Sequence, residues 1–298
     1  MRIFMTGASG WIGSAVVPEL LNAGHQVVGL ARSDSSAAAL EAVGVEVRRG
    51  SLDDLDSLAA GAADSEGVVH LGYNHDFSQI AAAAATDVQA IEVMGEALVG
   101  TGGPLLIASG VLGLRPGGIG TEDDRPAVGS FPRIAGAEAT LALAERGVRG
   151  VVARFAPTVH GAGDHGFVAT LVEVARTTGV SAYVGDGSHT WPAVHRSDAA
   201  RLVRLAVDHA PGGSVVHAVA EQGVPTREIA EAIARNLGIG TMSVGPETAL
   251  EHFGWIGRFF GAGMGASNAI TRNLLGWAPA GPGLLEDLDQ GHYFTTAG

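Results

Sequence analysis

The chain has 298 residues and a net charge of −13 with its histidines neutral, and all 18 of its basic residues are arginine, because it contains no lysine and no cysteine. This composition excludes a lysine Schiff base, a thiolate nucleophile, a disulfide and a cysteine metal site. The acidic balance argues against nucleic acids and anionic membranes as partners. The absence of a leader-like segment and of a long apolar run predicts a soluble, cytoplasmic protein.

Apolar segments alternate with helical segments through the first half of the chain. The segments expected as strands are continuously apolar, which is typical of a parallel sheet covered on both faces. The repeated βαβα order predicts an α/β fold with a doubly wound parallel sheet of the Rossmann type. The predicted strands are Arg2–Thr6, Gln26–Ala31, Val45–Arg48, Gly67–Leu71, Leu105–Ser109 and Gly150–Phe155, and the longest predicted helices are Ser78–Val99 and Ile134–Arg146.

A glycine turn at residues 6–13 (TGASGWIG) joins the first predicted strand to the first helix. Gly7 allows a tight turn, Gly10 lets the backbone approach a pyrophosphate, and Gly13 lets the helix pack closely on the strand. The N-terminus of the helix directs free N–H groups at the phosphates. Because a strand precedes the turn and an amphipathic helix follows it, the pattern favours a dinucleotide-binding loop over an ordinary glycine turn.

The second half is less regular and predicts a smaller, C-terminal substrate-binding lobe. Ser197 and Thr226 are expected to cap two helices. The predicted elements are helices at Asp198–Asp208 and Arg227–Leu237 and a strand at Ser214–Ala220. The expected division is a cofactor domain at residues 1–156, mainly a substrate lobe at 157–298, and a return to the first domain at 190–220.

Several further motifs follow the glycine turn in order: residues 68–72 (VVHLG), 107–110 (IASG), 154–161 (RFAPTVHG), 185–187 (GDG), 194–198 (VHRSD) and 275–279 (LGWAP). Together they make the chain resemble the extended short-chain dehydrogenases/reductases, the NAD-dependent epimerase/dehydratase-like proteins, over nearly its whole length. The resemblance implies a nicotinamide cofactor and catalysis by a Tyr-x-x-x-Lys pair. Here Ser130 and Ile134 occupy the two positions, so the chain resembles an atypical branch that lacks the pair.

The end of the second predicted strand bears on the choice between NAD and NADP. Where NAD binders place an acidic residue, this chain has Ala31, followed by Arg32 and Ser33. An arginine beside a hydroxyl suits a 2′-phosphate, so we expect NADP(H). The alternative is that Arg32 lies on a solvated turn and Asp34 holds the ribose.

The resemblance also implies the remaining cofactor contacts. It implies that Ser51 and Leu52 contact the adenine, that Gly72 and Tyr73 lie beside the ribose and pyrophosphate, and that backbone groups of residues 157–159 meet the nicotinamide carboxamide. Plain core packing is an equally good interpretation of Val159. The implied cofactor-binding residues are Thr6, Gly7, Ser9, Gly10, Trp11, Ile12, Gly13, Arg32, Ser33, Ser51, Leu52, Gly72, Tyr73, Ser109, Pro157, Thr158 and Val159.

Four residues are candidates for catalysis: Ser109, Tyr73, His75 and His160. Ser109 ends the fifth strand, where its hydroxyl would meet a carbonyl oxygen or simply cap the next turn. Tyr73 and His75 follow the fourth strand and are possible proton donors. His160 stands where relatives often have a pocket tyrosine.

Other polar residues have plainer interpretations. Asp76 is expected to cap the next helix, and Arg133 is expected to be a solvated residue at a helix start, although it could reach the cofactor ribose in place of the missing lysine. No zinc spacing occurs, so no metal is expected. Possible pocket-lining residues are Phe167, Tyr183, Trp191, Phe253 and Trp255.

The sequence predicts an NADP(H)-dependent oxidoreductase that transfers hydride to a small apolar carbonyl compound through a relocated proton donor. Imine reduction is a variant, because an iminium ion needs no such donor. The alternatives are a non-catalytic NADP-binding sensor and, more weakly, a nucleotide-sugar epimerase or dehydratase. Relatives pair the helices expected at Ser78–Val99 and Ile134–Arg146 into a four-helix bundle, so we expect a homodimer.

Overall fold

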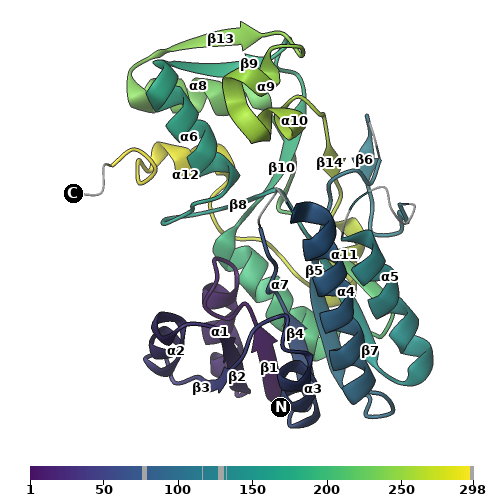
Figure 1. The fold of residues 1–298 in the computed structure, drawn as a ribbon. Coiled ribbons are helices and arrows are strands. Elements are labelled where there is room, and N and C mark those ends of the chain that lie inside the picture. Colours follow the sequence, from purple (N-terminus) through teal and green to yellow (C-terminus); the bar gives the residue numbers. More distant parts are fainter. Residues whose placement is uncertain (76–78, 116, 127–130, 132, 296–298) are drawn as a thin grey trace.

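The computed structural model describes residues 1–75, 79–115, 117–126, 131 and 133–295. These residues form two bodies, a larger one that contains the N-terminus and a smaller one built mostly from later parts of the chain (Figure 1). Asp76, Ser78 and Ser130, which carried expectations from the sequence, lie outside the described residues.

The larger body is built on a seven-stranded sheet in which all neighbouring strands run parallel. The strand order is β11-β7-β5-β4-β1-β2-β3, so the chain winds outward from β1 on one side and from β4 on the other. The expected doubly wound fold is therefore confirmed. The strands are β1 Arg2–Thr6, β2 Gln26–Ala31, β3 Glu46–Arg49, β4 Gly67–His70, β5 Pro104–Gly110, β7 Arg149–Phe155 and β11 Ser214–Ala218.

Helices cover both faces of this sheet, which explains why its strands are apolar throughout. Helices α1 and α7 cover one face, and α3, α4 and α5 cover the other (Figure 1). Along β1, Ile3 and Met5 belong to the core on the first face, whereas Phe4 belongs to the core on the second. The helices of this body are α1 Gly13–Asn22, α2 Asp34–Glu41, α3 Leu55–Ala63, α4 Ile80–Ala97, α5 Ile134–Ala142, α7 Arg196–His209 and α11 Ala269–Leu275.

The smaller body has its own apolar core, centred on Trp191, Phe253 and Phe260. A three-stranded sheet, β12-β10-β8, leads into it from the larger body, and a two-stranded sheet, β13-β9, lies at its far end (Figure 1). Its strands and helices are β8 Thr158–His160, β9 Val180–Val184, β10 Thr190–His195, β12 Glu221–Pro225, β13 Gly240–Val244, α6 Phe167–Thr178, α8 Thr226–Leu237, α9 Ala249–Phe253, α10 Gly257–Phe260 and α12 Leu284–Asp289. The short pair β14 Gly265–Ala266 and β6 Ile119–Gly120 completes the strands described.

Two expected helix caps are wrong. His195 caps α7, because its ring nitrogen accepts a hydrogen bond from the backbone N–H of Ser197. Thr226 is the first residue of α8, and its hydroxyl donates to the carbonyl of Gly187 instead of capping the helix. Both errors arise because a cap depends on backbone geometry that strand β10 or β12 imposes on the preceding residue.

None of the helices that the structure describes is both long enough and apolar enough to cross a membrane.

Candidate active site

The glycine turn closes against the carboxyl end of β4. Gly7 has a φ of +68°, and a Cβ atom there would lie 2.6 Å from the backbone nitrogen of Gly72. A Cβ atom at Gly13 would lie 2.0 Å from the carbonyl oxygen of Gly7. Both positions therefore require glycine, Gly7 for its left-handed backbone and Gly13 for the close start of α1.

At the N-terminus of α1, the backbone N–H groups of Trp11, Ile12 and Gly13 have no backbone acceptor among the described residues, whereas those of Ser14 and Ala15 donate to the carbonyls of Gly10 and Ile12. The N-cap of α1, Ile12, offers no side-chain hydrogen bond, and Ser9 and Gly10 are exposed beside it. The first N–H groups of a helix lack partners inside the helix and carry a partial positive charge. This end of α1 therefore suits a phosphate.

Trp11 joins the glycine turn to the smaller body. Its indole nitrogen donates to the carbonyl of Val159 at 2.8 Å, and the Arg196 guanidinium lies 4.1 Å above its ring and donates to its carbonyl at 2.6 Å. His165 meets the ring edge at a centroid distance of 5.8 Å. Trp11 thus holds the two bodies together, and its indole already engages the Val159 carbonyl that the resemblance assigned to a carboxamide.

At the end of β2, Arg32 is exposed and has no ion-pair or hydrogen-bond partner within the part of the chain that the structure describes. Asp34 is instead paired with Arg49 at 2.6 Å. The Ser33 hydroxyl caps α2 by accepting from the N–H of Ser36 at 3.1 Å. Ser33 and Asp34 are therefore engaged, whereas the charge of Arg32 is available.

Ser51 and Leu52 follow β3. The Ser51 hydroxyl accepts from the N–H of Asp53 at 3.3 Å, and Leu52 packs partly against the core beneath α3. Their contact with an adenine stays a prediction.

A buried chain of hydrogen bonds starts at the glycine turn. The Thr6 hydroxyl accepts from the N–H of Gly72 at 3.0 Å and meets His70 Nδ1 at 2.7 Å, and His70 Nε2 meets Asp87 Oδ1 at 3.1 Å. Because the carboxylate accepts, His70 Nε2 donates, and in a neutral imidazole Nδ1 then accepts from Thr6. These hydrogen bonds therefore link β1, β4 and α4 through buried polar groups.

The same carboxylate reaches an aromatic pair at the surface of the sheet edge. Arg133 Nη2 lies 3.7 Å from Asp87 Oδ1, and the Arg133 guanidinium lies 4.3 Å from the centroid of the Tyr73 ring. The Tyr73 ring meets His75 edge-on at 5.3 Å. We call Thr6, His70, Asp87, Arg133, Tyr73 and His75 the edge network.

Burial governs the charges at the outer end of the edge network. It raises the pKa of the Tyr73 phenol, and the Asp87 carboxylate raises it as well, whereas Arg133 lowers it. Burial, helped by Arg133 and His165, lowers the pKa of His75. At neutral pH both Tyr73 and His75 are therefore uncharged, a protonated phenol beside a neutral imidazole.

The family model of the NAD dependent epimerase/dehydratase family matches residues 3–220. The chain belongs to this family. An uncharacterized protein of Schizosaccharomyces pombe, C2A9.02, is 47% identical over 295 residues, which is 99% of this chain and all of the relative. A Stigmatella aurantiaca 4-hydroxy-2-methyl-3-oxo-4-farnesyl-3,4-dihydroquinoline-1-oxide ketoreductase is 28% identical over 234 residues, which is 72% of this chain and 67% of the relative. The structure of MoeE5 in complex with UDP-glucose and NAD has the same fold, with a TM-score of 0.76 and 24% identity over 98% of this chain and 97% of that one.

This member of the epimerase/dehydratase family has no charge at the expected lysine position. Ile134 is only 7% exposed and packs inside the larger body. Arg133, one residue earlier, was expected to be solvated, but its side chain is only 22% exposed. The expectation fails because Asp87 lies within ion-pair distance and the Tyr73 ring covers the guanidinium.

Ser109 lies on the strand next to Tyr73. Strand β5 pairs with β4 so that Ile107 faces His70, and continuing this register places Ser109 level with Gly72. Ser109 is almost completely buried at this edge. Its position suits a contact with the cofactor or substrate, which stays a prediction.

His160 belongs to a different cluster. Its Nδ1 lies 2.9 Å from Asp287 Oδ2 on α12, its ring meets His195 at 5.4 Å, and it is fully buried. Nearby, the Tyr293 hydroxyl donates to Asp164 at 2.9 Å and accepts from the N–H of Gly161. We call His160, His195, Asp287, Tyr293 and Asp164 the lobe network. The structure therefore brings Tyr73 and His75 together and places His160 elsewhere.

Two further predicted cofactor-binding residues lie where β7 leads into β8. Pro157 precedes β8, and Thr158 is buried, with a hydroxyl that has no hydrogen-bond partner among the described residues. Their contacts with a nicotinamide stay predictions.

Two of the expected pocket-lining residues are wrong. Trp191 and Phe253 are buried in the core of the smaller body, where Trp191 packs against Phe260 at 5.1 Å. Phe167 and Trp255, in contact at 5.3 Å, lie at the border of that core, with Trp255 38% exposed. From the sequence, a large aromatic side chain in a strand or helix fits either a pocket wall or the apolar core. In the structure, Trp191 and Phe253 pack in the core.

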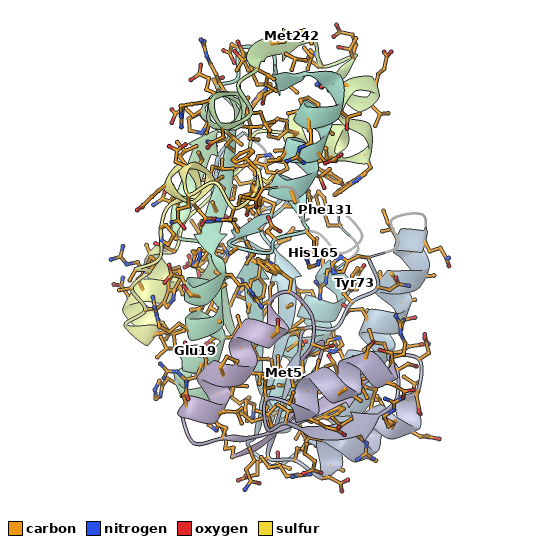
Figure 2. All side chains as sticks on the ribbon, turned by 90° about the vertical axis from the view of Figure 1, so that its left-hand side faces the viewer. Met5, Glu19, Tyr73, Phe131, His165 and Met242 are labelled. Atoms are coloured by element: carbon orange, nitrogen blue, oxygen red, sulfur yellow. The ribbon has the colours of Figure 1, made fainter. Side chains whose placement is uncertain are left out.

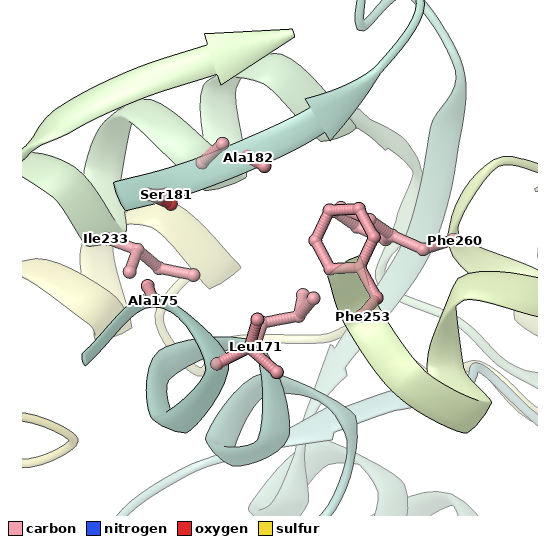
Figure 3. A pocket seen from close by; sticks show the side chains of 9 residues that line it. Leu171, Ala175, Ser181, Ala182, Ile233, Phe253 and Phe260 are labelled. Carbon is pink, nitrogen blue, oxygen red and sulfur yellow. The ribbon is translucent and has the colours of Figure 1, made fainter. Parts of the chain in front are cut away.

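Figure 3 shows a cavity in the same core, bordered by Leu171, Ala175, Ser181, Ala182, Ile233, Phe253 and Phe260. Ser181 supplies the only side-chain hydroxyl among the residues that line this cavity, and the side chains leave no room in it for a water molecule. It is a packing defect and offers no chemistry. Within the described residues, no group of three or more histidine or acidic side chains could hold a metal ion.

Sequence reasoning missed His70 and Asp87 as members of the site. A signal was present for Asp87, because it falls on the same helical face as the apolar residues Ala83, Ala90 and Ile91. A carboxylate on a buried face requires a partner.

Proposed function

We propose that the protein is an NADP(H)-dependent reductase that transfers hydride to a small, apolar carbonyl or imine compound. The observation that carries the proposal is the Tyr73 phenol, stacked against Arg133 at the carboxyl end of β4 and directly after Gly72, which contacts the glycine turn. In a doubly wound sheet the crevice between β1 and β4, where the strand order reverses, is the ligand site.

The glycine turn fits a dinucleotide. Gly7 and Gly13 leave no space for side chains, and the backbone N–H groups of residues 11–13, which have no backbone acceptor among the described residues, would donate to a pyrophosphate. Arg32 would contact the 2′-phosphate, because it is exposed at the end of β2 with no competing partner among the described residues. When bound, the cofactor supplies a hydride from its nicotinamide ring.

Tyr73 would complete the reduction of a carbonyl. Its raised pKa keeps the phenol protonated, so it donates a hydrogen bond to the substrate oxygen and gives up its proton as that oxygen becomes an alkoxide. The carbonyl carbon thus gains the hydride and the oxygen gains the proton. The neutral His75 ring, in contact with Tyr73, would return a proton from solvent to the phenolate.

The surroundings favour an apolar substrate. Phe131 packs closely over Gly113, where any side chain would collide with its ring. Figure 2 shows Phe131, His165 and Tyr73 in the region where the two bodies meet. The Stigmatella aurantiaca relative is a ketoreductase, which supports carbonyl reduction, and the compound in its name carries an apolar farnesyl group, which supports an apolar substrate.

The test is NADPH consumption with a panel of ketones, aldehydes and cyclic imines. For a carbonyl substrate, Tyr73→Phe should lower kcat by about 100-fold or more, whereas Tyr293→Phe, in the smaller body, should leave it nearly unchanged. For an iminium substrate, which needs no proton on a developing alkoxide, Tyr73→Phe should cost only a few-fold. Tight NADPH binding without turnover of any compound would contradict the reductase and favour a sensor.

We also propose a homodimer formed through α4 and α5. The outer side of α4 exposes small residues near its start, Ala81, Ala82 and Ala85, which would allow a second copy to approach closely. A mass measurement in solution at micromolar concentration tests this, and a monomer would contradict it.

A further inference from the structure

We propose that Arg133 is the positioning residue of this site: anchored by Asp87, it orients the Tyr73 phenol and donates hydrogen bonds to the ribose hydroxyls of the bound dinucleotide. This inference rests on the proposed function, because it assigns the role of the lysine that this chain lacks. It places that role on a residue one position before the family's lysine position.

The first support is the stacking of Arg133 on Tyr73. The guanidinium carbon lies 4.3 Å from the ring centroid, and the Arg133 side chain is 22% exposed. A cation over an aromatic face is attracted by the negative electrostatic potential of the ring, and partial burial strengthens the attraction. Arg133 therefore fixes the plane of the Tyr73 ring, and with it the direction of the phenol.

The second support is the anchor beneath Arg133. Asp87, almost fully buried, lies 3.7 Å from Arg133 Nη2 and accepts from His70, which in turn meets Thr6 of the glycine turn. The charge of Arg133 is thus compensated by a carboxylate that the strands hold in place. The position of the guanidinium is tied to the loop that would hold the pyrophosphate.

The third support is that Arg133 has unused donors. Its Nε and Nη2 atoms are buried, and neither has a hydrogen-bond acceptor among the residues that the structure describes. A distance of 3.7 Å to Asp87 is an ion pair but not a hydrogen bond. Buried donors without acceptors are costly and occur where a ligand or an ordered water completes the site. A ribose offers hydroxyl oxygens of the required kind.

Helix packing explains why residue 133 and not residue 134 has this role. Gly136 lets α5 approach α4 so closely that a Cβ atom there would lie 2.7 Å from Ile91 and 3.2 Å from Asp87 Oδ2. With α5 in this position, Ile134 is buried and Arg133, at the N-cap of α5, lies within ion-pair distance of Asp87.

Cofactor binding tests the donor role. Arg133→Met should weaken NADPH binding about tenfold or more in a fluorescence titration, because it removes charge-assisted donors, and Arg133→Lys should restore most of the affinity. Arg146→Met, which removes an exposed arginine from the end of the same helical segment, is the matched control and should change nothing. Equal NADPH dissociation constants for wild type and Arg133→Met would overturn the proposal.

Titration of Tyr73 tests the orienting role without requiring turnover. The chain has three tyrosines, so ¹³Cζ-labelled tyrosine gives three signals, and Tyr73→Phe identifies one of them. The charged groups around Tyr73 are Arg133, Asp87 and, when protonated, His75. Arg133→Met should raise the pKa of Tyr73, and Asp87→Asn should lower it, because the two groups act on the phenol with opposite signs. If Arg133 is not held beside the phenol, its removal leaves the pKa of Tyr73 unchanged, so an unchanged pKa, or shifts in the same direction, would overturn the proposal.

The proposal of a reductase and the proposal for Arg133 can be disproved independently of each other. If no compound is reduced but Arg133→Met weakens NADPH binding and raises the pKa of Tyr73, the reductase is wrong and the role of Arg133 stands. If carbonyl compounds are reduced and Arg133→Met changes neither quantity, the reductase stands and the role of Arg133 is wrong. Asp87→Asn keeps an acceptor for His70, so it provides a second, folded variant if Arg133→Met is unstable.

Discussion

The edge network and the lobe network contain the same kinds of residue in different settings. Each has a histidine bound to a buried aspartate, His70 with Asp87 and His160 with Asp287, and each has a tyrosine. The edge network ends at the junction of β1 and β4 in a phenol and in a guanidinium with buried donors that have no acceptor among the described residues. The lobe network ends in the Tyr293–Asp164 hydrogen bond, which ties the last described residues to the loop after β8.

This comparison shows that residue type alone does not identify a catalytic group. Burial raises the pKa of both Tyr73 and Tyr293, but Tyr293 already donates to Asp164, whose carboxylate raises its pKa further. Tyr293 is therefore held as a structural donor. Tyr73 lies beside the glycine turn, where a ligand would meet it.

The largest expected effect is on the lobe network. Asp287→Ala should lower the free energy of unfolding by about 3 kcal/mol, because it leaves the buried ring of His160 without its hydrogen-bond partner. Asp289→Ala, which removes an exposed ion pair with Arg235, should cost less than about 1 kcal/mol. Urea denaturation measures both. If the two variants lower the free energy of unfolding equally, the lobe network does not have the structural role assigned to it.

The second prediction distinguishes the edge network from the lobe network by the effect of a mutation on enzyme activity. Tyr73→Phe should reduce kcat for a carbonyl substrate by about 100-fold, whereas Tyr293→Phe should reduce stability and leave kcat at 25 °C nearly unchanged. Steady-state kinetics, with stability checked by thermal unfolding, measures this difference. If Tyr293→Phe loses as much kcat as Tyr73→Phe, the division into a catalytic and a structural network is wrong.

A third prediction concerns the cofactor at the edge of the sheet. Arg32→Ala should weaken NADPH binding by roughly one to two decades and leave NADH binding unchanged, since a charge-assisted contact contributes about 1.5–3 kcal/mol. Titration with both cofactors measures the effect. Arg48→Ala, at an ion pair with Asp64, is the control. Equal losses for NADPH and NADH after Arg32→Ala would reject the assignment of NADP.

The smallest expected effect is a change in pH dependence. Burial raises the pKa of Asp164, so the folded protein holds this proton to a higher pH than the unfolded chain does. The free energy of unfolding should therefore fall as pH rises from the ordinary carboxyl pKa through the raised value. Asp164→Asn should abolish this fall, as followed by urea midpoints from pH 2.5 to pH 7.

The control for that measurement is Asp186, whose pKa is shifted in the opposite direction. Ser188 lowers the pKa of Asp186 by hydrogen bonding, so Asp186 contributes stability that is lost as pH falls through the lowered value. Asp186→Asn should remove this loss and leave the fall due to Asp164 in place. A variant Asp164→Asn with the wild-type pH profile would show that the Asp164 carboxyl is not shifted.

Local sequence determined the larger body. The seven strands and the turn at residues 6–13 were predictable because continuous apolar runs, helical periodicity and glycine positions act over short stretches of chain. The family was recognisable for the same reason, since its motifs lie in contiguous segments. The position of Arg32 and the absence of the Tyr-Lys pair were also visible without a structure.

Only the tertiary structure decided which polar side chains meet. His70, Asp87 and Arg133 come from a strand and two helices, and their contact depends on β1 pairing with β4 and on Gly136 admitting α5 to α4. The same applies to His160, which the pairing of β8 with β10 and the docking of α12 direct into the smaller body. Such contacts depend on strand order and close packing between distant segments, and neither has a local signature in the chain.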